Sequence, residues 1–154
     1  MKAITFDKFG GPEVLYVSDN LEKPIISDEE VLIKVHAAGI NRPDILQRKG
    51  QYPPPKGASE ILGLEVSGSI VDCGKDIDKV FLNKNVCALV TGGGYAEYVK
   101  CHKSTILPVP KGISLSDACT IPETFLRYGQ IYLTLRSLKR MKHYLFTVAL
   151  VELD

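Results

Sequence analysis

The stretch NRPDILQRKGQYPPPKGASEILGLEVSG, residues 41–68, places a short helix, a rigid loop and a strand next to one another. Asn41 is a residue type that caps helices, Pro43 suits a first helical turn, and Gly50 is typical of a helix end. The prolines that follow exclude both a helix and a central strand. From residue 61 the pattern is that of a strand whose glycines indicate bulges or a close approach of the backbone. The stretch therefore predicts one short helix within a region that is otherwise β.

Outward from this stretch, the first 110 residues read as short strands separated by turns. Residues 29–40 form the longest predicted strand, with Val31, Ile33 and Val35 on one face. Residues 85–100, NVCALVTGGGYAEYVK, predict a hairpin around three consecutive glycines. Strand patterns of this kind predict a mainly β fold for this part of the chain.

The period of the apolar residues changes at Ser114, which begins a capping pattern. From there the apolar residues follow helical spacing, as one kinked helix or a pair of helices broken near Pro122. We therefore place the domain boundary between residues 113 and 114. The chain shows no internal repeat and no low-complexity tract.

Composition restricts the classes of function. The 154 residues carry a net charge of +1 and are 45% hydrophobic, so we expect neither nucleic acid nor a membrane as partner. The four cysteines lie far apart without a CxxC pair, which favours a reducing compartment over a disulfide framework. The N-terminus lacks the apolar region of a signal peptide, and no apolar run has the length of a membrane span. We expect a cytoplasmic protein.

Three motifs in order carry a resemblance to a known family. Residues 41–68, GGGYAEYV at 92–99 and PVPKGISLSDACTIPE at 108–123 resemble the zinc-independent quinone oxidoreductase branch of the medium-chain dehydrogenase/reductase family. The resemblance covers residues 1 to about 126. It implies an enzyme with a GroES-like β-barrel and a following Rossmann domain that holds NADPH. It also implies hydride transfer to a quinone or a related conjugated carbonyl.

The resemblance sets our expectation for the fold. We expect a mainly β protein, with a GroES-like β-barrel, short helices, and the first helix and one strand of an incomplete Rossmann domain. Residues 1–113 would be the GroES-like catalytic domain, 114–138 the start of a truncated Rossmann cofactor domain, and 139–154 an out-of-frame tail. Full-length relatives are expected to be homo-oligomers.

The residues argue against zinc. Zinc-dependent relatives have a Cys in the segment that here reads GINRPD and a His in the segment that here reads GLE, whereas this chain has Asn41 and Leu64. A catalytic zinc needs about three protein ligands with N, S or carboxylate donors, and Glu65 alone does not form a site. His36 shares its strand face with Lys34, which indicates a solvated face. We expect no metal.

Asn41 and Tyr52 are the cofactor-side candidates. The bare sequence favours a helix cap for Asn41 and an aromatic packed on prolines for Tyr52. The resemblance implies in addition that both lie beside the nicotinamide of NADPH. It makes Tyr52 the catalytic candidate, because a positioned phenol would stabilise charge that develops on the substrate carbonyl oxygen.

Two further residues are candidates for the wall of the substrate cleft, Arg42 and Glu65. For Arg42, Asp44, Gln47 and Arg48 on the short helix, spacing of three and four residues favours local ion pairing. For Glu65, a supporting role as a buried carboxylate is favoured over catalysis.

The glycines at 92–94 do not predict a phosphate-binding loop. A dinucleotide fingerprint needs GxGxxG after a strand and at the start of a helix, but a strand pattern follows here. The sequence contains no GxGxxG motif, and such a loop normally binds the pyrophosphate. At Arg127 the family usually has a Thr that meets the nicotinamide, so cofactor contact through this position is in doubt.

Residues 139–154, KRMKHYLFTVALVELD, stand where the family has a strand and a glycine loop. One possible coding sequence for them, read one nucleotide earlier, gives KKDETLLVHGGASGIG, which has the family's expected form. Our hypothesis is that these residues are the out-of-frame reading of a cofactor loop, and that Arg127 marks a smaller compensated slip. The alternative is a divergent terminus that completes a small domain.

We therefore expect an NADPH-dependent quinone oxidoreductase by family, with the isolated chain inactive and poorly soluble. Two alternatives stay open: a non-catalytic GroES-like binding module, and an alcohol dehydrogenase-like enzyme of the same superfamily. Asn41 and Leu64 disfavour the second.

Overall fold

The computed structural model describes residues 1–137, and their side chains as far as residue 129. The predicted Rossmann strand and the out-of-frame tail lie outside the described residues. Contacts divide the chain into two units, Met1–Pro122 and Glu123–Asp154. The boundary predicted at 113/114 stays a prediction. Within the described part, no helix is both long and apolar enough to cross a membrane.

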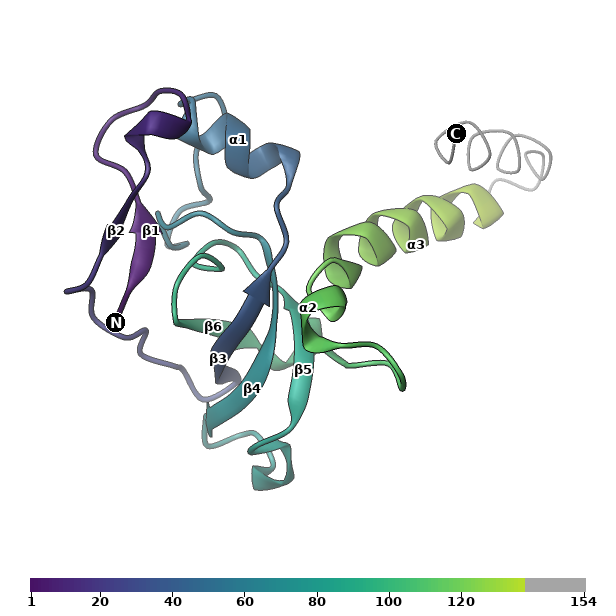
Figure 1. Cartoon of the computed structure of the whole chain (residues 1–154). Helices are drawn as coiled ribbons and strands as arrows, with labels where there is room; N and C mark the ends of the chain where they lie inside the picture. Colours follow the sequence, from purple (N-terminus) through teal and green to yellow (C-terminus); the bar gives the residue numbers. More distant parts are fainter. Residues whose placement is uncertain (138–154) are drawn as a thin grey trace. The chain divides into compact units, whose positions relative to one another are not determined.

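The first unit is mainly β, with short helices (Figure 1). Its strands are β1 (Ala3–Thr5), β2 (Tyr16–Ser18), β3 (Glu30–Ala38), β4 (Glu65–Cys73), β5 (Asn85–Leu89), β6 (Tyr98–His102) and β7 (Ile106–Pro108). The helices in the part of the chain that the structure describes are α1 (Arg42–Arg48), α2 (Leu115–Ala118) and α3 (Ile121–Ser137), with 3₁₀ turns at Pro12–Val14, Lys79–Phe81 and Lys103–Thr105. The break near Pro122 is confirmed, because α2 ends before it and α3 begins at Ile121.

The described strands form an open sheet, so the prediction of a closed barrel is wrong in this respect. Five antiparallel strands have the order β6-β3-β4-β5-β7, and β1 and β2 form a separate pair. A bridge between Ala3 of β1 and Ala96 links this pair to the segment just before β6. β7 is three residues long and ends at Pro108, which has no N–H to extend the ladder.

The predicted hairpin at residues 85–100 is also wrong. β5 pairs with β4 and β7, whereas β6 pairs with β3, so two strands separate β5 from β6. The glycines instead bond to residues 61–63: the Gly93 N–H donates to the Ile61 carbonyl (2.7 Å) and the Gly94 N–H to the Gly63 carbonyl (3.1 Å). A Cβ on Gly63 would lie 2.6 Å from Gly94 Cα, so the two segments touch backbone to backbone. The three glycines permit this contact instead of turning a hairpin.

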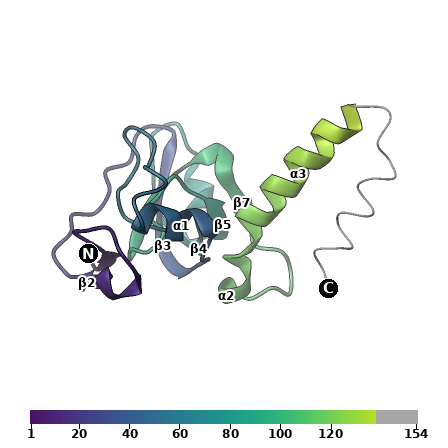
Figure 2. The same ribbon diagram turned by 90° about the horizontal axis from the view of Figure 1, so that it is seen from above.

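The core lies on one face of the five-stranded sheet. Val31 and Ile33 of β3 are fully buried, and Val35 packs against the same cluster, as the alternation in β3 predicted. Val66 and Ile70 of β4 complete the centre of the core. α2 packs on the sheet, where the buried Ser67 hydroxyl donates to the Leu115 carbonyl. Figures 1 and 2 show the β1–β2 pair on the side of this unit opposite α2.

Candidate functional site

Asn41 begins α1 immediately after β3, as its sequence position predicted. Its backbone is extended (φ −121°, ψ 157°), and its N–H donates to Asp44 Oδ2 over 2.8 Å, as in a capping box. Its side-chain Nδ2 donates to Glu65 Oε1, also over 2.8 Å. The structure therefore joins two of the predicted site residues, and the same Asn both starts a helix and faces the buried carboxylate.

Glu65 is the first residue of β4 and is 3% exposed. Its carboxylate packs directly against Gly39, where an added Cβ would lie 2.2 Å from Oε1. The Gly39 N–H also donates to the Glu65 carbonyl over 3.1 Å. A carboxylate this buried has to receive hydrogen bonds, and Asn41 supplies one. Its burial fits the supporting role that we predicted.

Asp44 is 2% exposed and faces inward, so the predicted local ion pairing along α1 is wrong for this residue. Asp44 Oδ1 accepts from the Gly63 N–H over 3.1 Å, and Oδ2 accepts from the Tyr95 hydroxyl over 3.0 Å. Asp44 lies three residues after the helix cap, so its carboxylate points back to the N-terminal end of α1 and away from Arg48. One carboxylate thus connects α1 to two glycine-containing segments.

Tyr95 is a residue that the sequence analysis did not single out. Burial raises the pKa of its phenol, and the nearby Asp44 and Glu65 carboxylates add to this rise. The phenol therefore stays protonated and acts as a donor near neutral pH, to Asp44 and at 3.4 Å to the Gly39 carbonyl. Its place after the three glycines in GGGYAEYV was the available signal.

Among the described residues, neither Tyr52 nor Arg42 forms a side-chain hydrogen bond with Asn41 or Glu65. Tyr52 follows the C-terminal end of α1 and is 42% exposed, whereas Asn41 stands at the N-terminal end. The seven residues of α1 rise about 10 Å between them. Arg42 is exposed on the first turn of α1. The roles predicted for Tyr52 and Arg42 stay predictions.

The four cysteines of the chain are free thiols, and all are buried. Burial raises the pKa of Cys87 and of Cys119, and the Glu65 carboxylate raises each further. Both thiols thus remain protonated beside the site. His36 is exposed on β3, as predicted.

The described residues contain no group of three or more His, Cys, Asp or Glu side chains arranged to hold a metal ion. They also do not fit the pyrophosphate of NADPH, because the glycines at 92–94 pack against residues 61–63 and lead into a strand rather than a helix. In the second unit, Arg127 pairs with Glu123 one turn earlier on α3, with 2.5 Å between Nε and Oε1.

Comparison with known proteins identifies the family to which this fold belongs. Residues 27–111, more than half of the chain, match the alcohol dehydrogenase GroES-like domain, and the chain belongs to that family. Within the wider medium-chain dehydrogenase/reductase family its relatives include quinone oxidoreductases. It is 32% identical over 127 residues to quinone oxidoreductase of Mus musculus and 33% identical to that of Homo sapiens. In both comparisons 79% of this chain is matched, but it spans only 37% of the relative's length.

Solved structures give the same likeness. The quinone oxidoreductase from Coxiella burnetii has a TM-score of 0.70 and 33% identity, over 79% of this chain and 41% of that chain. The Escherichia coli quinone oxidoreductase complexed with NADPH has a TM-score of 0.66 and 28% identity, over 77% and 36%. The GroES-like fold predicted from the sequence motifs is confirmed.

Proposed function

We propose that this chain supplies the substrate-side domain of an NADPH-dependent, zinc-independent quinone oxidoreductase. The single observation that carries the proposal is the Asn41–Glu65 hydrogen bond at the junction of β3, α1 and β4 in a GroES-like domain. This hydrogen bond holds the Asn41 side chain in one orientation, and the family resemblance implies that Asn41 contacts the nicotinamide. Relatives named quinone oxidoreductase, one of them complexed with NADPH, support the substrate and the cofactor.

The residues have different parts in this proposal. NADPH, when bound to the complete enzyme, supplies the hydride. Tyr52, exposed on the loop after α1, would donate a hydrogen bond to the substrate carbonyl oxygen, where negative charge develops as the hydride arrives. Asn41 would contact the cofactor side of the cleft, and Arg42 would lie along its wall. Glu65 would act through Asn41, because its own carboxylate is buried.

The described residues lack a loop for the cofactor's pyrophosphate, so we propose that the chain alone neither binds NADPH tightly nor reduces quinones. The first experiment is a titration of the chain with NADPH, followed by the fluorescence of the cofactor. We expect no saturation below about 1 mM. Saturation in the micromolar range would contradict this part of the proposal.

The second experiment adds the portion of a relative that this chain does not span. Residues 1–126 are fused to the remaining portion of the Coxiella burnetii quinone oxidoreductase, and NADPH oxidation is measured with 1,4-benzoquinone. We expect activity that falls about 100-fold in Tyr52→Phe, because one oxyanion-type donor is lost. Asn41→Ala should also lower it, whereas Asn20→Ala, at an exposed position, serves as the matched control. A folded chimaera that binds NADPH but leaves the quinone unreduced would reject the function.

A further inference from the structure

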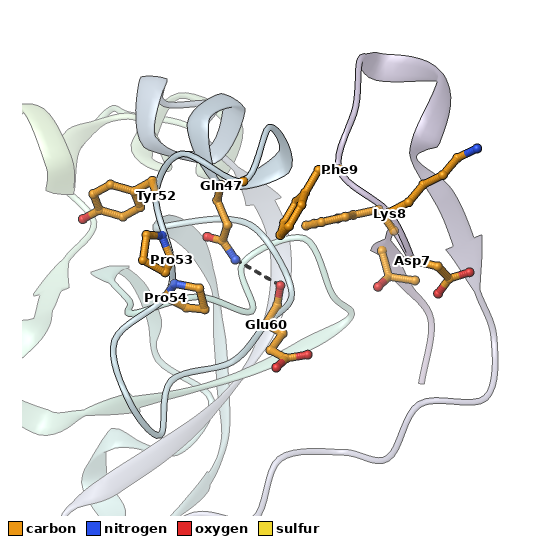
Figure 3. Close-up of a pocket in the computed structure, with 11 residues that line it drawn as sticks. Asp7, Lys8, Phe9, Gln47, Tyr52, Pro53, Pro54 and Glu60 are labelled. Atoms are coloured by element: carbon orange, nitrogen blue, oxygen red, sulfur yellow. Dashed lines mark hydrogen bonds between the residues drawn. The ribbon is translucent and has the colours of Figure 1, made fainter.

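A cavity of about 360 Å³ lies between the N-terminal segment at residues 5–9 and the proline-rich loop after α1 (Figure 3). Phe6 and Phe9 line one wall, and their ring centroids are 6.2 Å apart with the planes tilted by 48°. Pro53 and Pro54 line the facing wall. This volume lies within the range of sites that bind small molecules. The two walls offer flat apolar surfaces for a ring.

This cavity lies apart from the Asn41–Glu65 part of the candidate functional site. Asn41, Asp44, Glu65 and Tyr95 do not line it. Tyr52 borders it, but in Figure 3 its phenol points away from Phe9 and from the space between the walls. The proline-rich loop therefore presents two sides, and the cavity lies on the side away from the phenol.

The aromatic wall is held in place by α1. Gly50 has a positive φ of 73°, and an added Cβ would lie 2.8 Å from the Phe9 ring, so the ring rests directly on this glycine. The Gly10 N–H donates to the Arg48 carbonyl over 3.2 Å and joins the N-terminal segment to the end of the helix. Phe9 is thus positioned although it is 68% exposed.

Gln47 points to a ligand with a hydrogen-bond donor. Its side chain lines the cavity and is 6% exposed, and its Nε2 donates to the Glu60 carbonyl over 3.1 Å (Figure 3). Within the described chain its Oε1 has no hydrogen-bond partner, and it is not among the fully enclosed unpaired atoms. A buried amide oxygen without a protein partner can accept from a donor placed in the cavity that its side chain lines.

The charges around the cavity favour a cation. Glu60 and Asp7 both border the cavity, and within the described residues neither forms an ion pair, but in Figure 3 the Asp7 carboxylate points away from the proline wall. One Asp7 oxygen accepts from the Tyr16 hydroxyl over 2.7 Å, which leaves the other oxygen available. Lys8 also borders the cavity, but in Figure 3 its ammonium extends away from the proline wall.

We propose that this cavity binds an aromatic ring that carries a protonated amine. The ring packs between Phe9 and the Pro53–Pro54 wall, where the Phe9 face also attracts the cation. The ammonium donates to Gln47 Oε1 and is attracted by the carboxylate of Glu60. This proposal does not depend on the quinone reductase activity.

The test uses tryptamine and the full chain. The protein contains no Trp, so indole emission excited beyond the absorption of tyrosine comes from the probe alone. We expect saturable binding, seen as a rise in anisotropy. Indole-3-propionate has a similar ring and chain length with a carboxylate instead of the amine, and should bind at least about tenfold more weakly, a difference of about 1.4 kcal/mol.

Variants assign the binding to this cavity. Glu60→Gln should lower tryptamine affinity several-fold without weakening indole-3-propionate, and Phe9→Ala should lower the affinity for both. Both residues are exposed, and circular dichroism checks that each variant folds. Glu22→Gln removes an exposed carboxylate that does not line the cavity, and should leave binding unchanged. Equal affinity for the two probes, no saturation, or full affinity in Glu60→Gln would overturn the proposal.

Discussion

The side-chain amide of Asn41 and the carboxylate of Glu65 meet at 2.8 Å although the two residues are 24 positions apart. Asn41 begins α1 and Glu65 begins β4, so the bond joins the start of the helix to the start of a central strand. Nδ2 is committed to the carboxylate, and the Asn41 backbone carbonyl accepts from the Asp44 N–H over 3.1 Å. The orientation of a cofactor-side candidate is thus set by a buried acid behind it.

Replacing Asn41 by Asp would place a second carboxylate beside Glu65. Two like charges this close raise the pKa of one of them, so the pair stabilises the fold while it shares a proton and loses this stabilisation as the pH rises. We expect Asn41→Asp to lower the free energy of unfolding by about 2–4 kcal/mol at pH 7 and by less near pH 4. Urea denaturation across this range measures it. Asn20→Asp is the exposed control, and a deficit independent of pH would argue against the pairing.

Gly39→Ala tests the contact between Gly39 and Glu65. The new Cβ would lie 2.2 Å from Oε1, so Glu65 has to move and its bond to Asn41 is strained. We expect a loss of about 1–3 kcal/mol in thermal or urea unfolding. Gly129→Ala is the matched control, because an added Cβ meets nothing there and alanine favours a helix. Equal stability of the two variants would contradict the close packing.

Asp44→Asn removes a charge that serves three donors, the Tyr95 hydroxyl and the N–H groups of Asn41 and Gly63. An amide can accept through only one atom, so at least one buried donor loses its partner. We expect a loss of about 2–4 kcal/mol by urea denaturation. Asp76→Asn changes an exposed carboxylate and should cost little. Similar losses in both variants would show that Asp44 has no special structural part.

Tyr95 links stability to alkaline pH. Its pKa is raised above 10.0 in the folded chain, so the folded state retains a proton that the unfolded state releases. The resulting stabilisation is complete below pH 10.0 and is lost as the pH rises toward the folded pKa. We expect Tyr95→Phe to be less stable than the wild type near pH 8 by about 1 kcal/mol, with a gap that narrows above pH 10. Tyr52→Phe is the exposed control, and a constant gap for Tyr95→Phe would contradict the linkage.

The reading-frame hypothesis for residues 139–154 is tested on the coding DNA. Sequencing from the codon of Phe125 onward should reveal a second frame that encodes KKDETLLVHGGASGIG and continues as a Rossmann domain. A gene that offers no such frame would reject the hypothesis and leave these residues as a divergent terminus.

The sequence predicted what local chemistry determines. Alternation placed Val31 and Ile33 inside, and a cap residue followed by an early proline placed the start of α1 at Asn41. The burial of Glu65 also agrees with the prediction, whereas its supporting role stays a prediction. These features depend on a few neighbouring residues, whose preferences the rest of the fold did not override.

Long-range pairing was not predictable in the same way. The segment with three glycines has the local pattern of a hairpin, but strand order is decided by which surfaces bury each other, and β3 and β4 lie between β5 and β6. Asp44 had the spacing of an ion pair on a helix, yet it faces inward and accepts from the Asn41 N–H and from two donors in other segments, the Gly63 N–H and the Tyr95 hydroxyl. Tyr95 follows the three glycines in the sequence, but its hydrogen bond to Asp44 depends on the long-range contact between Gly63 and Gly94.

The bridge between Ala3 and Ala96 has a consequence for synthesis. The first strand to leave the ribosome lacks its partner on the larger sheet until the chain has grown past residue 96, and β3 waits for β6 at residues 98–102. Contacts this distant along the chain slow folding, because a long loop has to close before any pairing compensates for its entropy. The nascent N-terminal segment therefore stays without this sheet contact for longer than a strand that pairs with its neighbour in sequence.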